Sequence, residues 1–344
     1  MNHKFPYKWY LKDGFPAKNI EKHNLKVFGT FICGGGSSMG YKLAGYNHLG
    51  GVEIDKQIAP IYKINHNPKY LYNEDIRTFR IRNDLPEELF NIDILDGSPP
   101  CSVFSLAGKR EEGWGIEKTF REGQYKQSLD DLFFEYIALA KRLQPKVVIA
   151  ENVKGMLIGN AKIYCKKIKE VFIEAGYEVQ LFLLNAATMG VPQQRERVFF
   201  IARRKDLKLP ELKLSFNEKQ ISLQEVEKNL SNIFGKPTPP AYANYWLQCK
   251  QGQSIAKFHP KGSFFNTIKL HKNEPMPTIA TKKRCYMHYA KPFVPHDDIF
   301  KLCGAYALDY NFLDIDPVYL IGMSVPPVVM AQISHQIYLQ WFKK

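Results

Sequence analysis

Short apolar runs alternate with helix-like segments along the first 204 residues, and this alternation limits the fold more than any other feature of the sequence. A strand that is followed by a crossover helix lies parallel to its neighbour, so the rhythm predicts a mostly parallel sheet covered by helices. Residues 147–150 are all apolar, which is typical of a strand covered on both faces. We therefore predict an α/β fold with a doubly wound sheet, and strands at 26–32, 51–54, 92–96, 146–150, 178–184 and 198–202.

Three segments have the pattern of helices. Residues 129–143 place six apolar side chains on one face, with Ser128 as a suitable N-cap and Asp130 and Asp131 in the first turn. Residues 161–175 are followed by Gly176, the residue type expected just after a helix. The chain ends in an apolar helix at about 328–342.

The strand–helix rhythm stops after residue 204, so a second domain is expected there. Residues 207–273 have only short apolar runs and a proline-rich stretch at 236–240. We predict one domain from residues 1–204 with 291–344, and a smaller irregular domain at 205–290. A run without acids at 249–272 suits a phosphate backbone, because lysines displace condensed counterions, although a solvated loop would look similar. Its lysines are Lys250, Lys257, Lys261, Lys269 and Lys272.

The composition favours a polyanionic partner inside the cell. There are 48 Lys and Arg residues against 34 Asp and Glu, a net charge of +14, although a merely soluble basic protein would share this excess. The six cysteines form no C-x-x-C pair and have none of the close spacing of zinc or redox sites, so we expect a reduced, cytoplasmic chain without a metal. Residues 1–15 contain no apolar signal core, and we expect neither secretion nor membrane insertion.

A glycine-rich loop after the first predicted strand and an acidic residue after the second indicate a nucleoside cofactor. The loop permits a tight turn close to a ligand, although it could also serve helix–sheet packing. The Glu53 carboxylate can accept hydrogen bonds from two ribose hydroxyls, and Asp75 could reach an adenine amino group or be a surface residue. The candidate residues are Phe31, Cys33, Gly34, Gly35, Gly36, Glu53, Ile54, Asp75 and Ile76.

Cys101 is a candidate nucleophile because of its place in the sequence. It follows Asp96 and the predicted strand 92–96, on a loop at the carboxyl edge of the sheet, where open α/β folds bind ligands. Pro99 and Pro100 fix φ and leave few backbone donors, so the thiol can be held in one orientation. A lone cysteine is usually a small buried hydrophobic residue, but this loop position favours a reactive thiol.

Two further segments carry charged side chains near the same sheet edge. Glu151 follows strand 146–150 and could face the Cys101 loop, or act as a cap or ion-pair partner. Before strand 198–202, alternation puts Arg195 and Arg197 on one face and Glu196 on the other. That face could bind a phosphate or a pyrimidine carbonyl, or could simply be a charged strand entry.

In this order, the segments resemble the motifs of the DNA cytosine-5 methyltransferases of bacterial restriction–modification type. The resemblance covers about residues 26–337 except the middle stretch, and Pro-Cys, Glu-Asn-Val and Gln-x-Arg-x-Arg are more specific than any glycine-rich loop. The matching blocks are 31–40, Glu53, Asp75-Ile76, Pro99-Pro100-Cys101, Glu151-Asn152-Val153, 193–197 and 322–327.

The resemblance implies a Rossmann-like methyltransferase sheet completed by the C-terminal segment, with S-adenosyl-L-methionine as cofactor. It places a target-recognition domain at about 207–273, supported by 274–279, and adds Asp96, Pro99, Met323 and Ser324 to the cofactor site. Two positions depart from the family pattern. Cys33 stands where Phe-x-Gly-x-Gly has its first glycine, and Met323 stands where an asparagine is usual, so Ser324 could supply the missing polar contact.

The resemblance also implies covalent catalysis on a cytosine that is flipped out of the duplex. Cys101 adds to C6 while Glu151 hydrogen-bonds N3 and the exocyclic amine. Arg195 binds the O2 carbonyl and favours the thiolate, and Arg197 supports the catalytic loop or Glu151. Residues 104–127 are a candidate lid over the base.

Alternatives remain at this stage. The second interpretation is a tRNA cytosine-5 methyltransferase, because an RNA-acting branch shares these motifs. However, a middle region of about 70 residues with a basic run suits a compact DNA-recognition domain. A catalytically silent nucleic-acid-binding homologue is disfavoured by intact Cys101, Glu151 and Arg195. A nicotinamide-dependent oxidoreductase would leave Pro-Pro-Cys unexplained. We expect a monomer that acts on double-stranded DNA, with a cognate restriction endonuclease in the same system.

Overall fold

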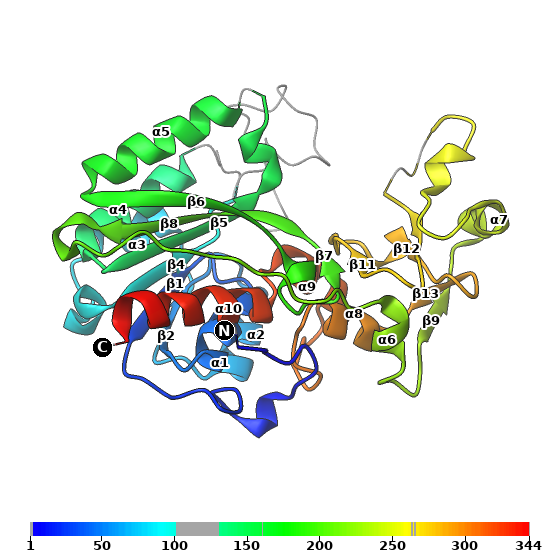
Figure 1. Ribbon diagram of the computed structural model, residues 1–344, viewed down its shortest axis with the longest axis horizontal. Helices are drawn as coiled ribbons and strands as arrows, with labels where there is room; N and C mark the ends of the chain where they lie inside the picture. Colours follow the sequence, from blue (N-terminus) through cyan, green and yellow to red (C-terminus); the bar gives the residue numbers. More distant parts are fainter. Residues whose placement is uncertain (1–2, 101–130, 160, 263, 265, 344) are drawn as a thin grey trace. The chain divides into compact units, whose positions relative to one another are not determined.

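The computed structural model describes residues 3–100, 131–159, 161–262, 264 and 266–343, and it divides into two compact units (Figure 1). Unit 1 consists of Met1–Phe15, Asn185–Arg195 and Phe216–Gln332. Unit 2 consists of Pro16–Leu184, Glu196–Ser215 and Ile333–Lys344. The bounds of these units differ from the domains predicted at 1–204 with 291–344 and at 205–290. The functional division of the chain stays a prediction.

Unit 2 is built on a seven-stranded sheet with the order β3-β2-β1-β4-β5-β8-β6. The pairs β1–β2, β2–β3, β1–β4 and β4–β5 are parallel, as predicted, while β8 runs antiparallel to β5. Strand β8 lies between β5 and β6 in the sheet and follows β6 in the chain. A parallel connection needs a crossover of a dozen or more residues, and the chain between β6 and β8 is too short to provide one. The strands are β1 Lys26–Thr30, β2 Asn47–Val52, β3 Tyr70–Tyr72, β4 Ile94–Gly97, β5 Val147–Val153, β6 Tyr177–Asn185 and β8 Glu196–Arg204.

Helices cover both faces of this sheet, α3, α4 and α5 on one face and α1 and α2 on the other (Figure 1). Helix α4 begins at Leu132 with Asp131 at its N-cap position, and the predicted cap Ser128 lies outside the described residues. Gly176 follows α5 with φ +96°, as a residue after a helix C-terminus often does. The helices are α1 Gly36–Leu43, α2 Ile58–His66, α3 Ile76–Ile81, α4 Leu132–Leu143 and α5 Ala161–Glu174.

Aromatic side chains fill the core between the sheet and helices α4 and α5. Phe133, Phe172 and Phe200 are buried together with Val148 of β5. Tyr136 on α4 is also buried, and its hydroxyl lies 2.9 Å from the carbonyl oxygen of Leu95 and 2.8 Å from that of Ile149. Because these carbonyls belong to β4 and β5, the tyrosine fixes the helix over the two strands that lead to the candidate site.

The C-terminal residues of unit 2 return to the first half of the chain, as the resemblance implied. The Tyr46 hydroxyl donates to the Ser334 carbonyl at 2.9 Å, and the Tyr338 ring stacks on His23. The predicted terminal helix is observed as α10 Pro327–Ile337, continued by a π-helical turn over Tyr338–Phe342.

One stretch, Pro317–Phe342, is long and apolar enough to pass a length-and-composition test for a membrane span among the described residues. However, 78% of its most apolar window is buried inside the protein. Core helices of soluble proteins pass the same test, so this stretch is weak evidence for a membrane segment.

Unit 1 consists of short elements around small cores. Its strands form three two-stranded pairs, β10–β12 and β11–β7 parallel and β13–β9 antiparallel. Helix α6 begins with a capping box in which Ser222 and Glu225 exchange hydrogen bonds. The elements are β7 Gln193–Gln194, α6 Leu223–Glu227, β9 Phe234–Pro237, α7 Pro240–Gln248, β10 Ile268–Lys269, β11 Met276–Pro277, β12 Tyr286–Met287, β13 Phe293–Pro295, α8 Asp297–Cys303, α9 Pro317–Met323 and most of α10.

Candidate active site

The glycine-rich loop between β1 and α1 turns sharply and is held by Glu53. Phe31, Cys33 and Gly35 have positive φ angles of 52°, 47° and 74°. The Glu53 carboxylate accepts the Cys33 N–H at 2.8 Å with one oxygen and the Asp55 N–H at 2.8 Å with the other. Cys33 thus occupies the left-handed conformation that glycine adopts most readily, which explains why the family pattern has glycine at this position.

Two side chains of helix α2 pack against this loop, and no sequence pattern indicated either of them. The Gly34 carbonyl lies 3.3 Å from His66 Nε2, which must be the donor because the carbonyl can only accept. The His66 ring stacks on Tyr62 with 4.3 Å between ring centroids. A Cβ atom on Gly35 would lie 2.2 Å from His66 Nε2, so Gly35 is required by packing as well as by its φ angle.

Two buried carboxyl groups lie at the carboxyl ends of β2 and β4, the two strands that pair with β1. Glu53 directly follows β2 and Asp96 is on β4, and both are at most 8% exposed. Burial raises the pKa of Glu53 to about 7, against the opposing effect of the N–H groups of Asp55 and Cys33. Burial also raises the pKa of Asp96 to about 7, although Tyr41 donates to its carboxylate at 3.1 Å. Perturbed carboxyls at this sheet edge are typical of functional sites.

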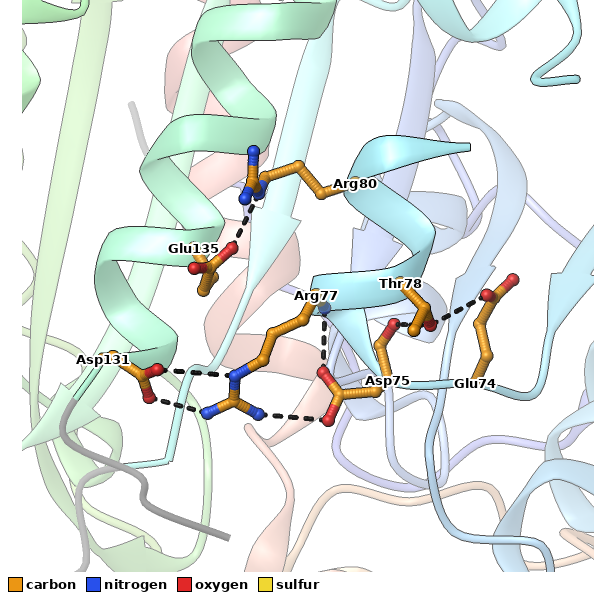
Figure 2. Close-up of polar contacts among 7 residues, drawn as sticks. All are labelled: Glu74, Asp75, Arg77, Thr78, Arg80, Asp131 and Glu135. Carbon is orange, nitrogen blue, oxygen red and sulfur yellow. Dashed lines mark hydrogen bonds and ion pairs between the residues drawn. The ribbon is translucent and has the colours of Figure 1, made fainter. Parts of the chain in front are cut away.

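Asp75 is the N-cap of helix α3, as Figure 2 shows. Its carboxylate accepts the Arg77 N–H at 2.8 Å and also contacts Arg77 Nη1 at 3.1 Å. The same guanidinium contacts Asp131 at 2.6 Å, and Arg80 contacts Glu135 at 2.6 Å (Figure 2). These ion pairs join α3 to α4, while Ile76 is buried in the core. The cofactor roles predicted for Asp75 and Ile76 stay predictions.

The loop before Cys101 is attached to the end of β5. Asn152 Nδ2 donates to the Pro99 carbonyl at 3.0 Å, and the Asn152 side chain is buried. Cys101 and the candidate lid at 104–127 lie outside the described residues. The sequence identified Asn152 only as part of a motif, whereas the structure gives it a positioning contact that the motif alone does not reveal.

Glu151 and Arg197 form an ion pair between neighbouring antiparallel strands. Arg197 Nε lies 3.0 Å from Glu151 Oε1, and these side chains are 17% and 10% exposed. This geometry agrees with the expected support of Glu151 by Arg197. Nearby, Lys154 contacts Glu196 at 2.8 Å in a more exposed pair.

Arg195 is held within unit 1 by backbone carbonyls. Its guanidinium contacts the Gly322 carbonyl at 3.1 Å and the Ile279 carbonyl at 3.4 Å, and the residue is 4% exposed. The motif segment around it is paired with 276–279, because β11 lies beside β7 and Thr278 Oγ1 donates to the Gln194 carbonyl at 2.6 Å. This pairing holds the motif segment in place, and the support of the recognition domain that the family resemblance assigned to 274–279 stays a prediction.

The last predicted cofactor residues also belong to unit 1. Ser324 is buried, and its hydroxyl accepts from Tyr306 at 2.6 Å and donates to the Leu320 carbonyl at 2.8 Å. Met323 is 42% exposed. The Ser324 hydroxyl therefore has a structural task in addition to the cofactor contact predicted for it.

The five lysines of the basic run do not share one environment. Lys250, Lys257, Lys261 and Lys272 are exposed. Lys269 is buried, with its ammonium 3.7 Å from the centroid of the Trp246 ring and 3.0 Å from the Trp246 carbonyl oxygen. An ammonium engaged in this way packs the protein interior, so we retain only the four exposed lysines as candidate phosphate contacts.

Comparisons with known proteins agree with this architecture. Residues 25–305 match the family model of C-5 cytosine-specific DNA methylases. The Type II methyltransferase M.NgoPII of Neisseria gonorrhoeae is 32% identical over 275 residues, covering 78% of this chain and 75% of that protein. M.FnuDI of Fusobacterium nucleatum, also a Type II methyltransferase, is 40% identical over 185 residues, which cover 54% of this chain and about half, 48%, of that protein. A mutant of Spodoptera frugiperda DNMT2 shares the fold, with a TM-score of 0.64, 17% identity and coverage of 92% and 100%.

The mostly parallel sheet with its motif residues at strand ends defines a Rossmann-like methyltransferase. The chain belongs to the C-5 cytosine-specific DNA methylase family. It is a DNA cytosine-5 methyltransferase, which confirms the predicted family, fold class and enzyme and favours DNA over tRNA as the substrate. The reaction requires a methyl donor.

Proposed function

We propose that this methyltransferase modifies a cytosine flipped out of a specific sequence in double-stranded DNA, with S-adenosyl-L-methionine as donor and Cys101 as covalent nucleophile. The proposal rests on two contacts at the end of β5. Asn152 donates to the carbonyl of Pro99, two residues before Cys101, and Glu151 forms an ion pair with Arg197. This arrangement attaches the cysteine loop beside a carboxylate of fixed orientation.

The residues around the glycine-rich loop fit the cofactor. Burial raises the pKa of Glu53 and of Asp96 to about 7, so hydroxyl donors or a positive charge beside them would stabilise the charged carboxylates. S-adenosyl-L-methionine has both, and when bound it supplies an electrophilic methyl group. The proposed binding residues are Phe31, Cys33, Gly34, Gly35, Gly36, Glu53, Ile54, Asp75, Ile76, Asp96, Pro99, Met323 and Ser324.

The catalytic residues act on the cytosine ring. The Cys101 thiolate forms a bond to C6 while Glu151 hydrogen-bonds N3 and the exocyclic amine, so C5 becomes nucleophilic. Arg195 binds the O2 carbonyl, and Arg197 keeps Glu151 in position. After C5 has formed its bond to the methyl group and lost its proton, the bond to C6 breaks and Cys101 leaves as a thiolate. A stacked base cannot reach these groups, which is why the base must be flipped at a cost of a few kcal/mol.

Expression of the chain in a host without cytosine methylation tests the proposal. Bisulfite sequencing of DNA and of tRNA should find 5-methylcytosine in one DNA sequence context and none in tRNA. The Cys101→Ser variant, expressed to the same level, provides the background. Methylation confined to tRNA would contradict the proposal. We also propose that the protein is a monomer in the cytoplasm and that a cognate restriction endonuclease belongs to the same system. The experiment above does not depend on either point.

The raised pKa of Glu53 predicts that cofactor affinity depends on pH. The pKa of Glu53 is about 7 in the folded protein, against an ordinary value of 4.5. The Glu53 carboxyl group therefore binds its proton more tightly in the folded protein than in the unfolded chain. The free energy of unfolding of the protein thus falls as pH rises from about 4.5 to about 7. Since the carboxylate is the better acceptor for two ribose hydroxyls, affinity for S-adenosylhomocysteine should rise by up to about tenfold per unit below pH 7 and then level off.

Calorimetry between about pH 5.5 and about pH 8.5 measures this dependence. Glu53→Gln should weaken binding by roughly ten- to a hundredfold near neutral pH and make the profile less steep by up to about tenfold per pH unit, so that only the dependence due to Asp96 remains. Glu174→Gln, a change of an exposed carboxyl on α5, is the control and should keep the wild-type profile. An unchanged affinity in Glu53→Gln would show that the cofactor binds elsewhere.

The exposed lysines should act on the DNA backbone. The double variant Lys257→Ala/Lys261→Ala is expected to lower the affinity for cognate and for non-cognate DNA about equally, because phosphate contacts carry no sequence information. The slope of log affinity against log salt should decrease by about two. Lys162→Ala/Lys166→Ala on α5 removes the same charge from unit 2 and should leave the slope unchanged. Equal slopes for both double variants and the wild type would reduce the basic run to a solvated surface.

A further inference from the structure

Helix α7 in unit 1 has one face fixed in the protein. Tyr242 is buried in a small core with Cys249, and its ring packs edge-to-face on Phe264 at 5.0 Å. Trp246 Nε1 donates to the His288 carbonyl at 2.7 Å, and the Lys269 ammonium lies over the Trp246 ring. The helix is therefore attached rigidly along its inner side.

Helix α7 lies at the periphery of unit 1 (Figure 1). The residues on its opposite face are exposed along the whole helix. At 100° per residue, its exposed residues fall within an arc of about 120°, with Asn244 in the middle of the arc and Gln248 about 40° to one side of it. Leu247 beside them is 79% exposed, the highest value among the large exposed hydrophobic residues of the described chain. The face consists of Pro240, Ala241, Asn244, Leu247 and Gln248.

The chain segment that contains this face carries only positive charge. Residues 228–273 contain seven lysines and no Asp or Glu. Lys236 before the helix and Lys250 after it are both exposed, whereas the face itself has no charged residue. An uncharged strip with lysines before and after it is complementary to a DNA groove, whose base edges lie between two rows of phosphates.

The side chains on the face have the chemistry of base readers. Asparagine and glutamine make paired hydrogen bonds to N6 and N7 of adenine, and apolar side chains contact the methyl group of thymine. The major groove of B-form DNA is wide enough for an α-helix, whereas that of A-form RNA is not accessible to side chains. A protein-binding face would instead be expected to present a cluster of aromatic and apolar anchors. Here Leu247 is the only large apolar side chain on the face, which otherwise has two amides and the small residues Pro240 and Ala241.

We propose that α7 enters the major groove and that Asn244 and Gln248 select adenine, with Leu247 on the thymine methyl group. This inference rests on the proposed action on double-stranded DNA and assigns the reading of sequence to α7. The exposed lysines then contribute affinity, and the α7 face contributes specificity. The recognised sequence contains at least one A·T pair near the modified cytosine.

The test is to map 5-methylcytosine by bisulfite sequencing in a methylation-free host that expresses the full chain. Wild type is compared with Asn244→Ala, Gln248→Ala and Leu247→Ala. Gln220→Ala, which removes another exposed amide of unit 1, is the matched control. We expect the wild type and the control to methylate one context with an invariant A·T pair. The Asn244→Ala and Gln248→Ala variants should each lose preference at one A·T position by about 5- to 150-fold while still methylating cytosine.

The outcomes separate this inference from the proposed function. If the wild type leaves DNA unmethylated, the proposed function itself fails. If the wild type methylates a context and all three α7 variants methylate the same context with the same stringency, only the reading role of α7 is wrong. Circular dichroism and affinity for S-adenosylhomocysteine should match wild type in every variant, because the replaced side chains are exposed. A relaxed context with intact folding therefore supports base reading and excludes a general loss of structure.

Discussion

Cys101→Ser is expected to abolish methyl transfer while DNA binding stays within about tenfold of wild type. A serine hydroxyl fills nearly the same space as the thiol, but it is not ionised at neutral pH and is a far weaker nucleophile toward C6. The loss should appear in turnover, by at least about a thousandfold, and hardly in the affinity for DNA or S-adenosylhomocysteine. Single-turnover assays with tritiated cofactor measure the first quantity, and gel-shift titrations measure the second.

DNA that contains 5-fluorocytosine identifies the bonded atom. Fluorine at C5 cannot leave as the proton does, so the bond between Cys101 and C6 persists after methyl transfer. A covalent adduct should form only with S-adenosylmethionine present, and peptide mapping should place it on Cys101. Cys285→Ser changes a half-buried cysteine outside the proposed site and should keep the adduct. An adduct that persists in Cys101→Ser would remove Cys101 as the nucleophile.

The sheet was predictable because its strands are buried and apolar, but two features of it were not. Strand β3 has only three residues, Tyr70–Tyr72, which is too short to show a pattern. The reversal of β8 depends on its pairing with β5, a contact between segments about 50 residues apart. Apolar periodicity identifies a strand and its buried faces, but it contains no information on the direction in which the strand enters the sheet.

The candidate site was predictable where a residue does chemistry, and less so where it holds another residue. Glu151 was identified from its motif and its place after a strand, and the structure adds its pairing with Arg197. The contacts of His66 with the Gly34 carbonyl and of Asn152 with the Pro99 carbonyl depend on tertiary structure. Lys269 was predicted to contact phosphate because it belongs to a basic run. Its packing on the Trp246 ring depends on tertiary structure and could not be predicted from that run.

Arg197→Met is expected to lower the free energy of unfolding by about 3–5 kcal/mol, because it leaves the Glu151 carboxylate without its partner at a 10% exposed position. Lys154→Met is the matched control. It breaks the pair with Glu196, the neighbour of Arg197 in β8; these side chains are 38% and 43% exposed, and pairs of that kind contribute about 0–1 kcal/mol. Urea unfolding of the full chain compares the two variants.

A double variant distinguishes the effect of the Glu151–Arg197 pair on stability from the effect of Glu151 on methyl transfer. Glu151→Gln combined with Arg197→Met removes both charges, so most of the lost stability should return, as a double-mutant cycle measures. Activity should not return, since the new amide cannot replace the carboxyl group that acts on N3. Equal destabilisation by Arg197→Met and Lys154→Met would show that the Glu151–Arg197 contact is no stronger than a surface pair. Recovery of methyl transfer in the double variant would remove Glu151 from the catalytic residues.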